Sequence, residues 1–340
     1  MTEPLPLVLT PGDPAGVGTE IALKAWLARE GLPSFFLMDD PVRVTALATD
    51  LGLDVPVYEI EYPEEAHRAY RDALPVLLHE FERRVVPGQP EPGNAGGVIR
   101  AIDRAVEWAR TGEVGGVVTC PINKKVLYDG AGFAFPGHTE YLAHLGNVDR
   151  TVMMLAAPGL RVVPVTIHVP LSDVPDLLSS ELIVETAQIT DRAMRRDFGI
   201  EMPRLAIAGL NPHAGEGGAM GSEDIAVIAP AIETLRAEGI DAVGPLPADT
   251  RFHPEARARY DVALTMYHDQ GLIPIKTLDF ARGVNVTLGL PFVRTSPDHG
   301  TAYDIAGKGV ADPRSLLEAI RVAGEMAEAR LAVQNGSQTG

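Results

Sequence analysis

The sequence predicts an α/β protein built on a mostly parallel sheet with helices on both of its faces. Short apolar runs alternate along the chain with longer amphipathic segments, which is typical of β-strands connected by helices that cross over the sheet. The chain has 340 residues, of which 46% are hydrophobic. It is therefore long and apolar enough for a large core, in one domain or in two lobes.

The predicted strands are short aliphatic and β-branched runs, and the predicted helices are the longer segments between them. We expect strands at 5–10, 35–38, 116–120, 152–156, 162–167, 205–210 and 262–266, and helices near 18–30, 94–111, 180–198, 222–238 and 313–333. Apolar residues in 180–198 recur with roughly helical spacing. The Pro- and Gly-rich run at 85–94 is expected to be a linker or a loop, and the polar tail at 336–340 to be frayed.

The charge balance excludes one class of partner. The chain carries 46 acidic and 29 basic residues, for a formal net charge of −17. Such an acidic protein is a poor ligand for a polyphosphate backbone, so nucleic acid is not expected as a partner. A small anion is not excluded, because one local group of Lys and Arg side chains can hold it.

Cysteine usage and the lack of long apolar runs indicate a cytoplasmic protein. Cys120 is the single cysteine, which leaves no internal disulfide and no cysteine-rich zinc site. The first residues, MTEPLPLVLT, lack the basic start of a signal peptide. No run of about 18 uncharged apolar residues is present, so we expect no membrane span.

Three histidines follow predicted strands. His168 ends RVVPVTIH, His213 ends RLAIAGLNPH, and His268 ends DVALTMYH, each in a loop or at its mouth. Ligands of open α/β sheets bind beyond the carboxyl ends of the strands, and three neutral imidazoles suit a divalent ion such as Zn²⁺ or Co²⁺. The alternative is that each histidine is an ordinary loop or core residue, because their spacing matches no local zinc motif.

A second group of residues has the character of an anion pocket. His138 and Thr139, in PGHTEYL, are expected near the start of a helix, where free N–H groups favour an anion; Thr139 could equally be an N-cap. Lys276 lies in an apolar segment, and either reaches the surface or meets an anion. Arg294, which we expect after an apolar strand, suits bidentate capture of phosphate or carboxylate, with Asn285 nearby in sequence.

The run TPGDPAGVGTEI at 10–21 partly matches a dinucleotide-binding fingerprint. It follows a predicted strand, opens a predicted helix, and is followed about 20 residues later by Asp39 and Asp40. Ile21 occupies the third glycine position, however, and no Walker lysine is present. We therefore favour a close strand–helix turn over a Rossmann site.

The chain resembles the 4-hydroxythreonine-4-phosphate dehydrogenases of pyridoxal phosphate biosynthesis. The resemblance lies in GDPAGVG, CPINKK, PGHTEYL, GLNPHAGEGG, GPLPADT, MYHDQGLIPIK and GVNVTLGLPFVRTSPDHGTA, which span residues 11 to about 310 in order. One departure is Ala219, where some relatives have His. The resemblance implies an isocitrate/isopropylmalate-dehydrogenase-like α/β/α fold with two lobes around a central cleft and no Rossmann dinucleotide domain. We place the first lobe at 1–135 plus about 285–335 and the second at about 136–284.

The resemblance also implies an activity. It is the oxidation of 4-phosphooxy-L-threonine at C3 by NAD or NADP, with one divalent ion (Zn, Mg or Co) per active site. The resulting β-keto acid decarboxylates to 3-amino-2-oxopropyl phosphate, in pyridoxine 5'-phosphate biosynthesis. The family works as a homodimer with the active site at the subunit interface. By resemblance, the metal ligands are His168, His213 and His268, the substrate contacts are His138, Thr139, Lys276, Asn285 and Arg294, and Asp249 lies near the site.

The sequence leaves the catalytic base, the nicotinamide contacts and the exact substrate unassigned. The catalytic base is Lys276, His138 or Asp249, and the residues that bind the nicotinamide are unassigned, as are the preference between NAD and NADP and the metal used in the cell. The main alternative is a paralogous dehydrogenase of threonate or erythronate 4-phosphate. More distant alternatives are a phosphate acyltransferase of similar fold and a phosphate-sensing binding protein without enzymatic activity.

Overall fold

The chain folds into two compact units. The computed structural model describes residues 4–337, and the side chains of residues 4–333. The first unit comprises Met1–Arg150 and Leu290–Ala332, and the second Thr151–Gly289 and Val333–Gly340. The divisions thus fall later than the predicted 135/136 and 284/285, and the helix that begins at His138 belongs to the first unit. The predicted cleft between two lobes stays a prediction.

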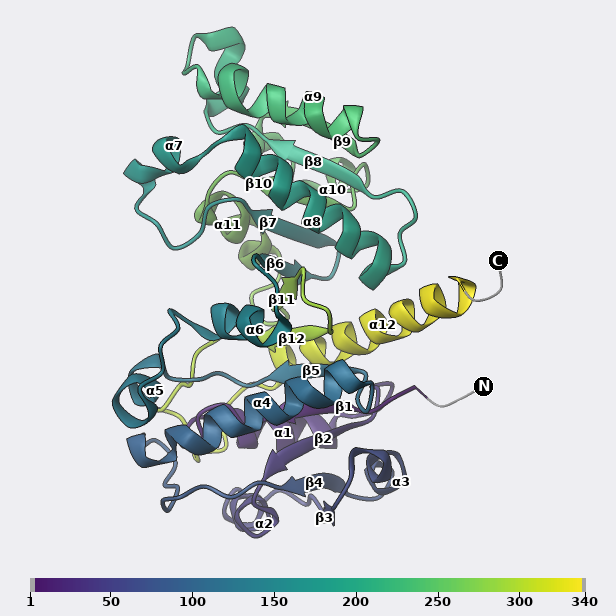
Figure 1. Cartoon of the computed structure of the whole chain (residues 1–340). Helices are drawn as coiled ribbons and strands as arrows, with labels where there is room; N and C mark the ends of the chain where they lie inside the picture. The colour runs from purple at the N-terminus through teal and green to yellow at the C-terminus, as the bar shows by residue number, and fades with distance from the viewer. Residues whose placement is uncertain (1–3, 338–340) are drawn as a thin grey trace. The chain divides into compact units, whose positions relative to one another are not determined.

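The first unit contains a fully parallel set of strands. Their order is β3-β4-β2-β1-β5-β12, and every neighbouring pair is parallel (Figure 1). The strands are β1 (Leu7–Thr10), β2 (Phe35–Asp39), β3 (Val57–Ile60), β4 (Leu74–Leu78), β5 (Gly116–Thr119) and β12 (Arg294–Pro297). The helices are α1 (Gly18–Leu27), α2 (Pro41–Asp50), α3 (Ala66–Tyr70), α4 (Ala95–Thr111), α5 (Lys124–Ala131), α6 (His138–Gly146) and α12 (Arg314–Ser337).

Burial of apolar faces on both sides of these strands explains the helices around them. All four residues of β1 are buried, as expected for a central parallel strand covered on both faces. α4 buries one face, which includes Ile102 and Trp108, in a core cluster with Phe36 and Leu142. It ends at Gly112, whose φ of 80° is the left-handed conformation that terminates many helices.

The second unit contains strands in both directions. Their order is β11-β6-β7-β10-β8-β9, in which β6 is antiparallel to both β11 and β7, and the other pairs are parallel. The strands are β6 (Val152–Ala157), β7 (Leu160–Pro164), β8 (Arg204–Ala208), β9 (Asp241–Leu246), β10 (Val262–Thr265) and β11 (Val284–Leu288). The helices include α7 (Val174–Leu177), α8 (Ser180–Phe198), α9 (Ala229–Ala237), α10 (Pro254–Arg257) and α11 (His268–Leu278).

The predicted α/β class is confirmed, and each predicted strand and helix has a counterpart. Five strands were not predicted, namely β3, β4, β9, β11 and β12. The helices that were not predicted are α2, α3, α5, α7, α10 and α11, the last of which contains Pro274. The run at 85–94 is a loop between β4 and α4 inside the first unit, not a linker between units. α12 includes residues 336 and 337, and the rest of the predicted frayed tail lies outside the described residues. Within residues 4–337, no helix combines the length and apolar character needed to cross a membrane.

Candidate active site

Two of the three predicted imidazoles lie together in the second unit. The rings of His168 and His268 have centroids 5.8 Å apart and are tilted by 42°. Both residues line a pocket of about 320 Å³, with the apolar side chains of Ile167, Leu171 and Val174 around them. His268 was predicted in a loop or at its mouth, but it is the first residue of α11. The strand ends therefore bring two candidate ligands to one pocket.

Hydrogen bonds between the ends of β7 and β10 explain this proximity. The Thr166 hydroxyl donates to the Met266 carbonyl at 2.7 Å, and the Val165 N–H donates to the Thr265 carbonyl at 2.7 Å. His168 and His268 each follow two residues later. Because parallel strands end at the same edge, these bonds bring the two side chains to that edge together.

The Asp269 carboxylate orients the ring of His268. Its Oδ1 lies 2.7 Å from Nδ1 of His268. An ionised carboxylate accepts the Nδ1 proton, which leaves Nε2 as the lone-pair nitrogen. Metal-ligating histidines commonly have such a carboxylate on the ring nitrogen opposite the metal. The His268–Asp269 pair therefore fits a divalent ion bound at Nε2.

His213 stands in an unusual backbone segment. Residues 213–217, within the turn Pro212–Gly218, all have left-handed dihedrals, with φ of 54° at His213, 52° at Ala214 and 42° at Glu216. Each non-glycine residue in this conformation costs about 1–2 kcal/mol, so neighbouring structure must hold the segment in place. His168 also has a left-handed φ, of 51°. Such strain is concentrated at functional sites in many proteins, which supports a role for both histidines.

The metal site as a whole stays a prediction. His213 is exposed, with Nδ1 3.6 Å from Glu216 Oε2, and does not line the pocket of His168 and His268. Among the described side chains of residues 4–333, no three or more His, Cys, Asp or Glu are grouped so that they could hold an ion. The single chain thus assembles two of the three expected ligands.

Three further predicted residues lie in the second unit. Lys276, in the last turn of α11, is half-buried and lines a pocket of about 360 Å³ that it shares with His268. Asn285 lies on β11, and its Oδ1 is buried without a hydrogen-bond partner in the described chain. Asp249 is exposed in the short turn Ala248–Thr250 and lines neither of the two pockets. His268 thus connects the imidazole pair with the predicted lysine.

Arg294 is buried in the first unit. It is the first residue of β12, not a residue after a strand as predicted, and is 4% exposed. Its Nη2 and Nε donate to the Thr119 hydroxyl at 2.7 and 3.2 Å, and burial lowers the pKa of Arg294 to about 10. A buried guanidinium is stabilised by an opposite charge, so this position favours an anion.

His138 lies close enough to Arg294 to be affected by its charge. Burial and the Arg294 charge together lower the pKa of His138 well below its ordinary 6.5, so the imidazole is neutral at neutral pH. Its Nε2 is buried and has no hydrogen-bond partner within residues 4–337. A buried polar atom left unpaired is costly, so a ligand atom here would stabilise the site. His138 and Thr139 begin α6, and because Gly137 is the N-cap, Thr139 does not have the alternative role of cap.

An aromatic cluster and one polar contact hold α6 in place. The rings of Phe133, Phe135 and Tyr141 pack with centroids 5.0 to 5.5 Å apart. The hydroxyl of Tyr141 also donates to the Asp103 carboxylate on α4. The start of α6, with His138 and Thr139, is therefore fixed to the core of the first unit.

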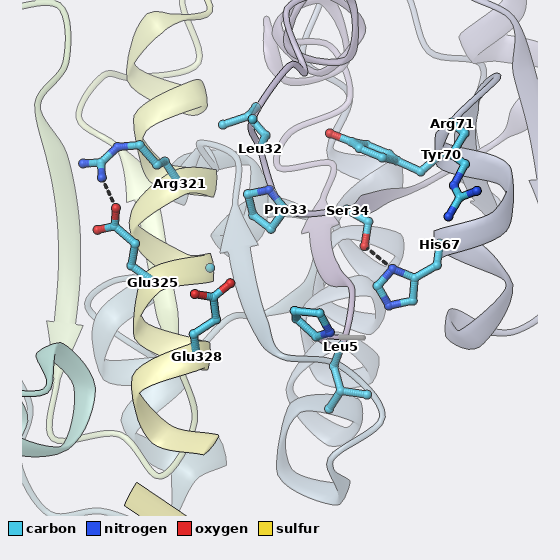
Figure 2. Close-up of a pocket in the computed structure, with 13 residues that line it drawn as sticks. Leu5, Leu32, Pro33, Ser34, His67, Tyr70, Arg71, Arg321, Glu325 and Glu328 are labelled. Carbon is cyan, nitrogen blue, oxygen red and sulfur yellow. Dashed lines mark hydrogen bonds and ion pairs between the residues drawn. The ribbon is translucent and has the colours of Figure 1, made fainter. Parts of the chain in front are cut away.

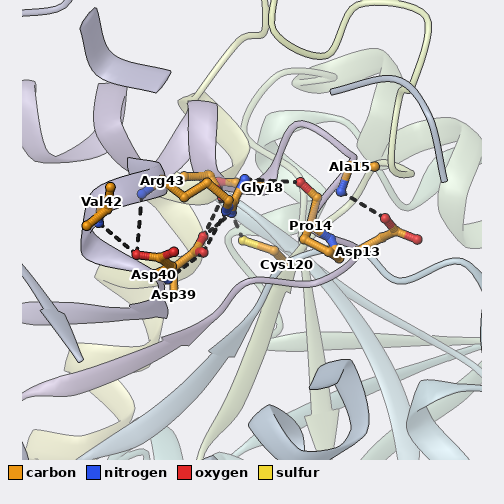
Figure 3. A network of polar contacts seen from close by, with 10 residues as sticks. Asp13, Pro14, Ala15, Gly18, Asp39, Asp40, Val42, Arg43 and Cys120 are labelled. Carbon is orange, nitrogen blue, oxygen red and sulfur yellow. Dashed lines mark hydrogen bonds and ion pairs between the residues drawn. The ribbon is translucent and has the colours of Figure 1, made fainter. Parts of the chain in front are cut away.

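The run at 10–21 is a close strand–helix turn, as expected from its sequence. The carboxylate of Asp39 is fully buried, accepts from Thr19 Oγ1 at 2.8 Å, and forms an ion pair with Arg43 (Figure 3). The carboxylate of Asp40 caps α2 and accepts from the Val42 N–H at 2.8 Å. Both acids thus bind partners within the chain. A Cβ on Gly18 would lie 2.4 Å from the Pro11 carbonyl oxygen, so close packing explains this glycine.

A further pocket of about 560 Å³ lies at the opposite, amino ends of β1 and β2 in the first unit. It is flanked by Arg321 and Glu328 of α12 and by His67 and Tyr70 of α3 (Figure 2). Nδ1 of His67 is 2.6 Å from the Ser34 hydroxyl. Ligands of open α/β sheets bind at the carboxyl ends of strands, so we do not assign catalysis to this pocket.

Sequence reasoning missed three polar side chains that support the candidate site. Thr119 accepts both hydrogen bonds from Arg294, and Asp224 and Gln270 bond the backbone before His213. Thr119 ends the apolar strand GVVT, which is a signal of the kind that marked the histidines. Asp224 and Gln270 carry no comparable signal, because their partners are distant in sequence.

Comparison with known proteins places the chain in a family. The family model of the pyridoxal phosphate biosynthetic protein PdxA matches residues 34–323. The chain belongs to the PdxA family. A 4-hydroxythreonine-4-phosphate dehydrogenase of Paracoccus denitrificans (strain Pd 1222) is 57% identical over 97% of this chain and 100% of its own length. A 4-hydroxythreonine-4-phosphate dehydrogenase of Caulobacter vibrioides is 53% identical over 96% of this chain and 98% of its own length. The resemblance drawn from the motifs is thereby confirmed.

Solved structures agree with this PdxA membership. The 4-hydroxythreonine-4-phosphate dehydrogenase of Klebsiella pneumoniae superposes with a TM-score of 0.86 at 36% identity, covering 95% of this chain and 99% of that one. A terephthalate 1,2-cis-dihydrodiol dehydrogenase from Burkholderia xenovorans LB400 has a TM-score of 0.65 at 28% identity, and the match covers 94% of this chain and 98% of that one. A branched-chain phosphotransacylase from Enterococcus faecalis gives 0.55 at 12% identity, which shows the fold alone. The fold is that of PdxA dehydrogenases and not a Rossmann dinucleotide domain.

Proposed function

We propose that the chain is a divalent-metal-dependent 4-hydroxythreonine-4-phosphate dehydrogenase that uses NAD or NADP. It would oxidise 4-phosphooxy-L-threonine at C3 to a β-keto acid, which loses CO₂ to give 3-amino-2-oxopropyl phosphate. The observation that carries the proposal is the pairing of the His168 and His268 rings at adjoining strand ends, in a chain of the PdxA family. The dehydrogenase names of its relatives supply the reaction class.

The imidazoles would hold the metal. His168 and His268 would bind it with His213, and the Asp269 carboxylate keeps Nε2 of His268 free for this purpose. A divalent ion at these nitrogens, whether Zn, Co or Mg, supplies a Lewis acid that lowers the pKa of a substrate hydroxyl and stabilises developing negative charge. Zn²⁺ and Co²⁺ match imidazole ligands better than Mg²⁺, which prefers oxygen.

The substrate phosphate would bind basic side chains, the Thr139 hydroxyl and two side chains that have a buried polar atom without a partner in the described chain. In the first unit these are the buried Arg294 guanidinium, the unpaired Nε2 of His138 and the Thr139 hydroxyl at the start of α6. In the second unit they are Lys276 and Asn285, whose carboxamide has a buried oxygen without a partner in the described chain. A guanidinium with an ammonium suits a phosphate dianion. The contacts fix the substrate relative to the metal, which is the main contribution of such groups.

Oxidation at C3 also requires a proton acceptor and a hydride acceptor. NAD or NADP would supply the hydride acceptor when bound. The base remains one of Lys276, His138 and Asp249. Burial and the charge of Arg294 lower the pKa of His138 well below 6.5, which leaves its imidazole neutral but weakens it as a base. We assign no residue to the nicotinamide, since Asp39 and Asp40, the acids that a dinucleotide fingerprint would use, bind Thr19, Arg43 and the start of α2.

A homodimer with a shared site is part of the proposal. Exposed apolar side chains adjoin both pockets of the second unit. Leu171 is 67% exposed beside the imidazole pair, and Ile273 and Phe280 are 61% and 78% exposed beside Lys276. Large exposed apolar groups around a site are typical of a protein interface. A second copy that covers them would supply the enclosure that the single chain lacks.

A spectrophotometric assay tests the proposed function. The purified chain is stripped with a chelator and mixed with 4-phosphooxy-L-threonine, either nicotinamide, and Zn²⁺, Co²⁺ or Mg²⁺ in turn. Reduction of the nicotinamide should require both the substrate and an ion, and threonate or erythronate 4-phosphate should react more slowly. Full activity without any divalent ion would overturn the metal role, and faster turnover of threonate or erythronate 4-phosphate would identify the paralogous activity.

A further inference from the structure

We infer that Asp224 and Gln270 are positioning residues that hold the backbone before His213 against the end of β10, which leads into His268. Through them, the second unit would preform the loop that presents its third imidazole before an ion arrives. The inference rests on the proposed metal site. It assigns no contact with the metal or the substrate to either residue.

Asp224 binds the loop from one side. It is fully buried at the start of the π-helical turn Asp224–Ile228. Its Oδ1 accepts from the Leu210 N–H at 2.9 Å, and its Oδ2 accepts from the Asn211 N–H at 3.3 Å and from Asn211 Nδ2 at 2.9 Å. One buried carboxylate therefore gathers three donors from the two residues that precede the Pro212–Gly218 turn.

Two glycines allow the loop to close around this carboxylate. A Cβ on Gly209 would lie 2.4 Å from Asp224 Oδ1, and one on Gly215 would lie 3.1 Å from Oδ2. Gly215 also has a φ of 76°, in the left-handed run that contains His213. The left-handed segment is thus built around Asp224, because any larger residue at Gly209 would displace it.

Gln270 binds the loop from the other side. Its Oε1 accepts from the Met266 N–H at 2.7 Å, and its Nε2 donates to the Gly209 carbonyl at 2.7 Å. Gln270 lies in the first turn of α11, two residues after His268. Its carboxamide therefore connects the segment of His268 with the segment of His213, and it uses the donor and the acceptor at once, which no carboxylate can do.

These contacts oppose the strain of the loop. Left-handed non-glycine residues persist only where the surroundings hold them. Without Asp224 or Gln270, we expect residues 209–218 to relax and His213 to lose its fixed position. An ion would then have to order the loop as it binds. Loss of groups that orient metal ligands typically weakens metal binding by about 10- to 100-fold.

Substitutions that preserve size separate this role from mere stability. Gln270→Met removes both hydrogen bonds. Gln270→Glu keeps the acceptor for the Met266 N–H but places a carboxylate oxygen against the Gly209 carbonyl oxygen, where the two repel. Asp224→Asn presents an NH₂ group to N–H donors. Gln188→Met is the matched control, because Gln188 on α8 donates a hydrogen bond to Glu238 in the same unit, away from the Gly209–Gly218 backbone.

The experiment uses the full chain with Zn²⁺ or Co²⁺ alone. Dissociation constants come from calorimetry, amide hydrogen exchange reports on residues 209–218 without metal, and urea unfolding reports on stability. We expect Gln270→Met and Gln270→Glu to weaken metal binding by about 10- to 100-fold and to speed exchange in the loop, while Gln188→Met changes neither. Asp224→Asn can unfold the chain because it changes a fully buried carboxylate. If that variant does not fold, the result of the test comes from the two Gln270 variants.

Two outcomes distinguish the inference from the proposed function. A folded Gln270→Met chain with wild-type metal affinity and wild-type exchange in residues 209–218 would overturn the inference while leaving the metal site intact. If the wild-type chain binds neither ion, the proposed function fails. In that case unchanged exchange in the Gln270 variants would overturn the anchoring as well, and faster exchange would support it.

Discussion

His168 and His268 stand with their ring centroids 5.8 Å apart, each two residues beyond the Thr166–Met266 hydrogen bond that joins the two chain segments. This separation allows two nitrogens to approach one ion after small rotations of the rings. Ring nitrogens bind Zn²⁺ at about 2.0–2.1 Å, so two ligands of one ion are necessarily close. The pair is the part of the proposed metal site that one chain already assembles.

Replacing either member of the pair should abolish metal binding. His168→Ala and His268→Ala should each reduce the bound metal to a trace while the chain stays folded, because His168 is exposed and His268 only half-buried. Elemental analysis after dialysis against Zn²⁺ measures this, and circular dichroism checks the fold. His253→Ala is the control, since exposed His253 makes no capping side-chain bond on α10. Undiminished metal in both pair variants would contradict the assignment.

Thr119 should matter to substrate binding through Arg294. Thr119→Val keeps the shape and removes the oxygen that accepts two hydrogen bonds from the guanidinium. We expect KM for the phosphorylated substrate to rise about 10-fold, the equivalent of one hydrogen bond to a charged group, with KM for the nicotinamide little changed. Initial-rate kinetics with each substrate varied gives both values.

The same substitution at a surface threonine is the control for Thr119→Val. Thr49→Val also removes a hydroxyl, but from exposed α2, where it donates to the Thr45 carbonyl at 2.9 Å. Its kinetics should match the wild type. If Thr119→Val raised both KM values equally, the specific link between Arg294 and the phosphate would be wrong.

Stability should fall as the pH decreases below the ordinary histidine value. The pKa of His138 lies well below 6.5 in the folded chain, mainly through burial, and the pKa of His79 is also lowered, mainly through burial. The unfolded chain therefore takes up these protons at a higher pH than the folded chain, so protonation favours unfolding. The part of the unfolding free energy that depends on neutral imidazoles is fully present above pH 6.5. It is progressively lost as the pH falls below that value.

Urea unfolding at about pH 7.5 and about pH 5 measures this effect. His138→Gln cannot take up the proton, so the loss of unfolding free energy between the two values should be smaller in the variant than in the wild type. An equal loss in both chains would show that His138 does not contribute.

Gly130 in α5 should not tolerate a side chain. A Cβ there would lie 1.9 Å from the Pro92 carbonyl oxygen and 2.8 Å from Ala95 Cβ, so Gly130→Ala forces α5 away from the start of α4. We expect the unfolding free energy to fall by about 2 kcal/mol or more. Gly300→Ala is the control, because no atom lies within 4 Å of its Cβ, and should change stability by less than about 0.5 kcal/mol. Equal stability of the two variants would contradict this packing.

Sequence patterns predicted most of the longer elements but not the strands that mix polar and apolar residues. β3 is VYEI, with two exposed residues, and β12 is RTSP, which is fully buried but contains three polar residues. β12 is placed by pairing Arg294 with Val117 and Thr295 with Val118 of β5, a relationship distant in sequence. Local periodicity does not report such pairing, because a short polar run is equally typical of a loop.

The sequence by itself determined the alternation of strands and helices, the polar residues at the strand ends and the family, because each of these depends on local pattern or on short motifs. Only the tertiary structure decided which side chains meet. It brought His168 to His268, buried Arg294 beside Thr119 and His138, and left His213 exposed on a left-handed loop. The physical reason is that these relationships depend on long-range hydrogen bonds and burial, such as those that Asp224 and Gln270 make to the His213 loop, and no local propensity encodes them.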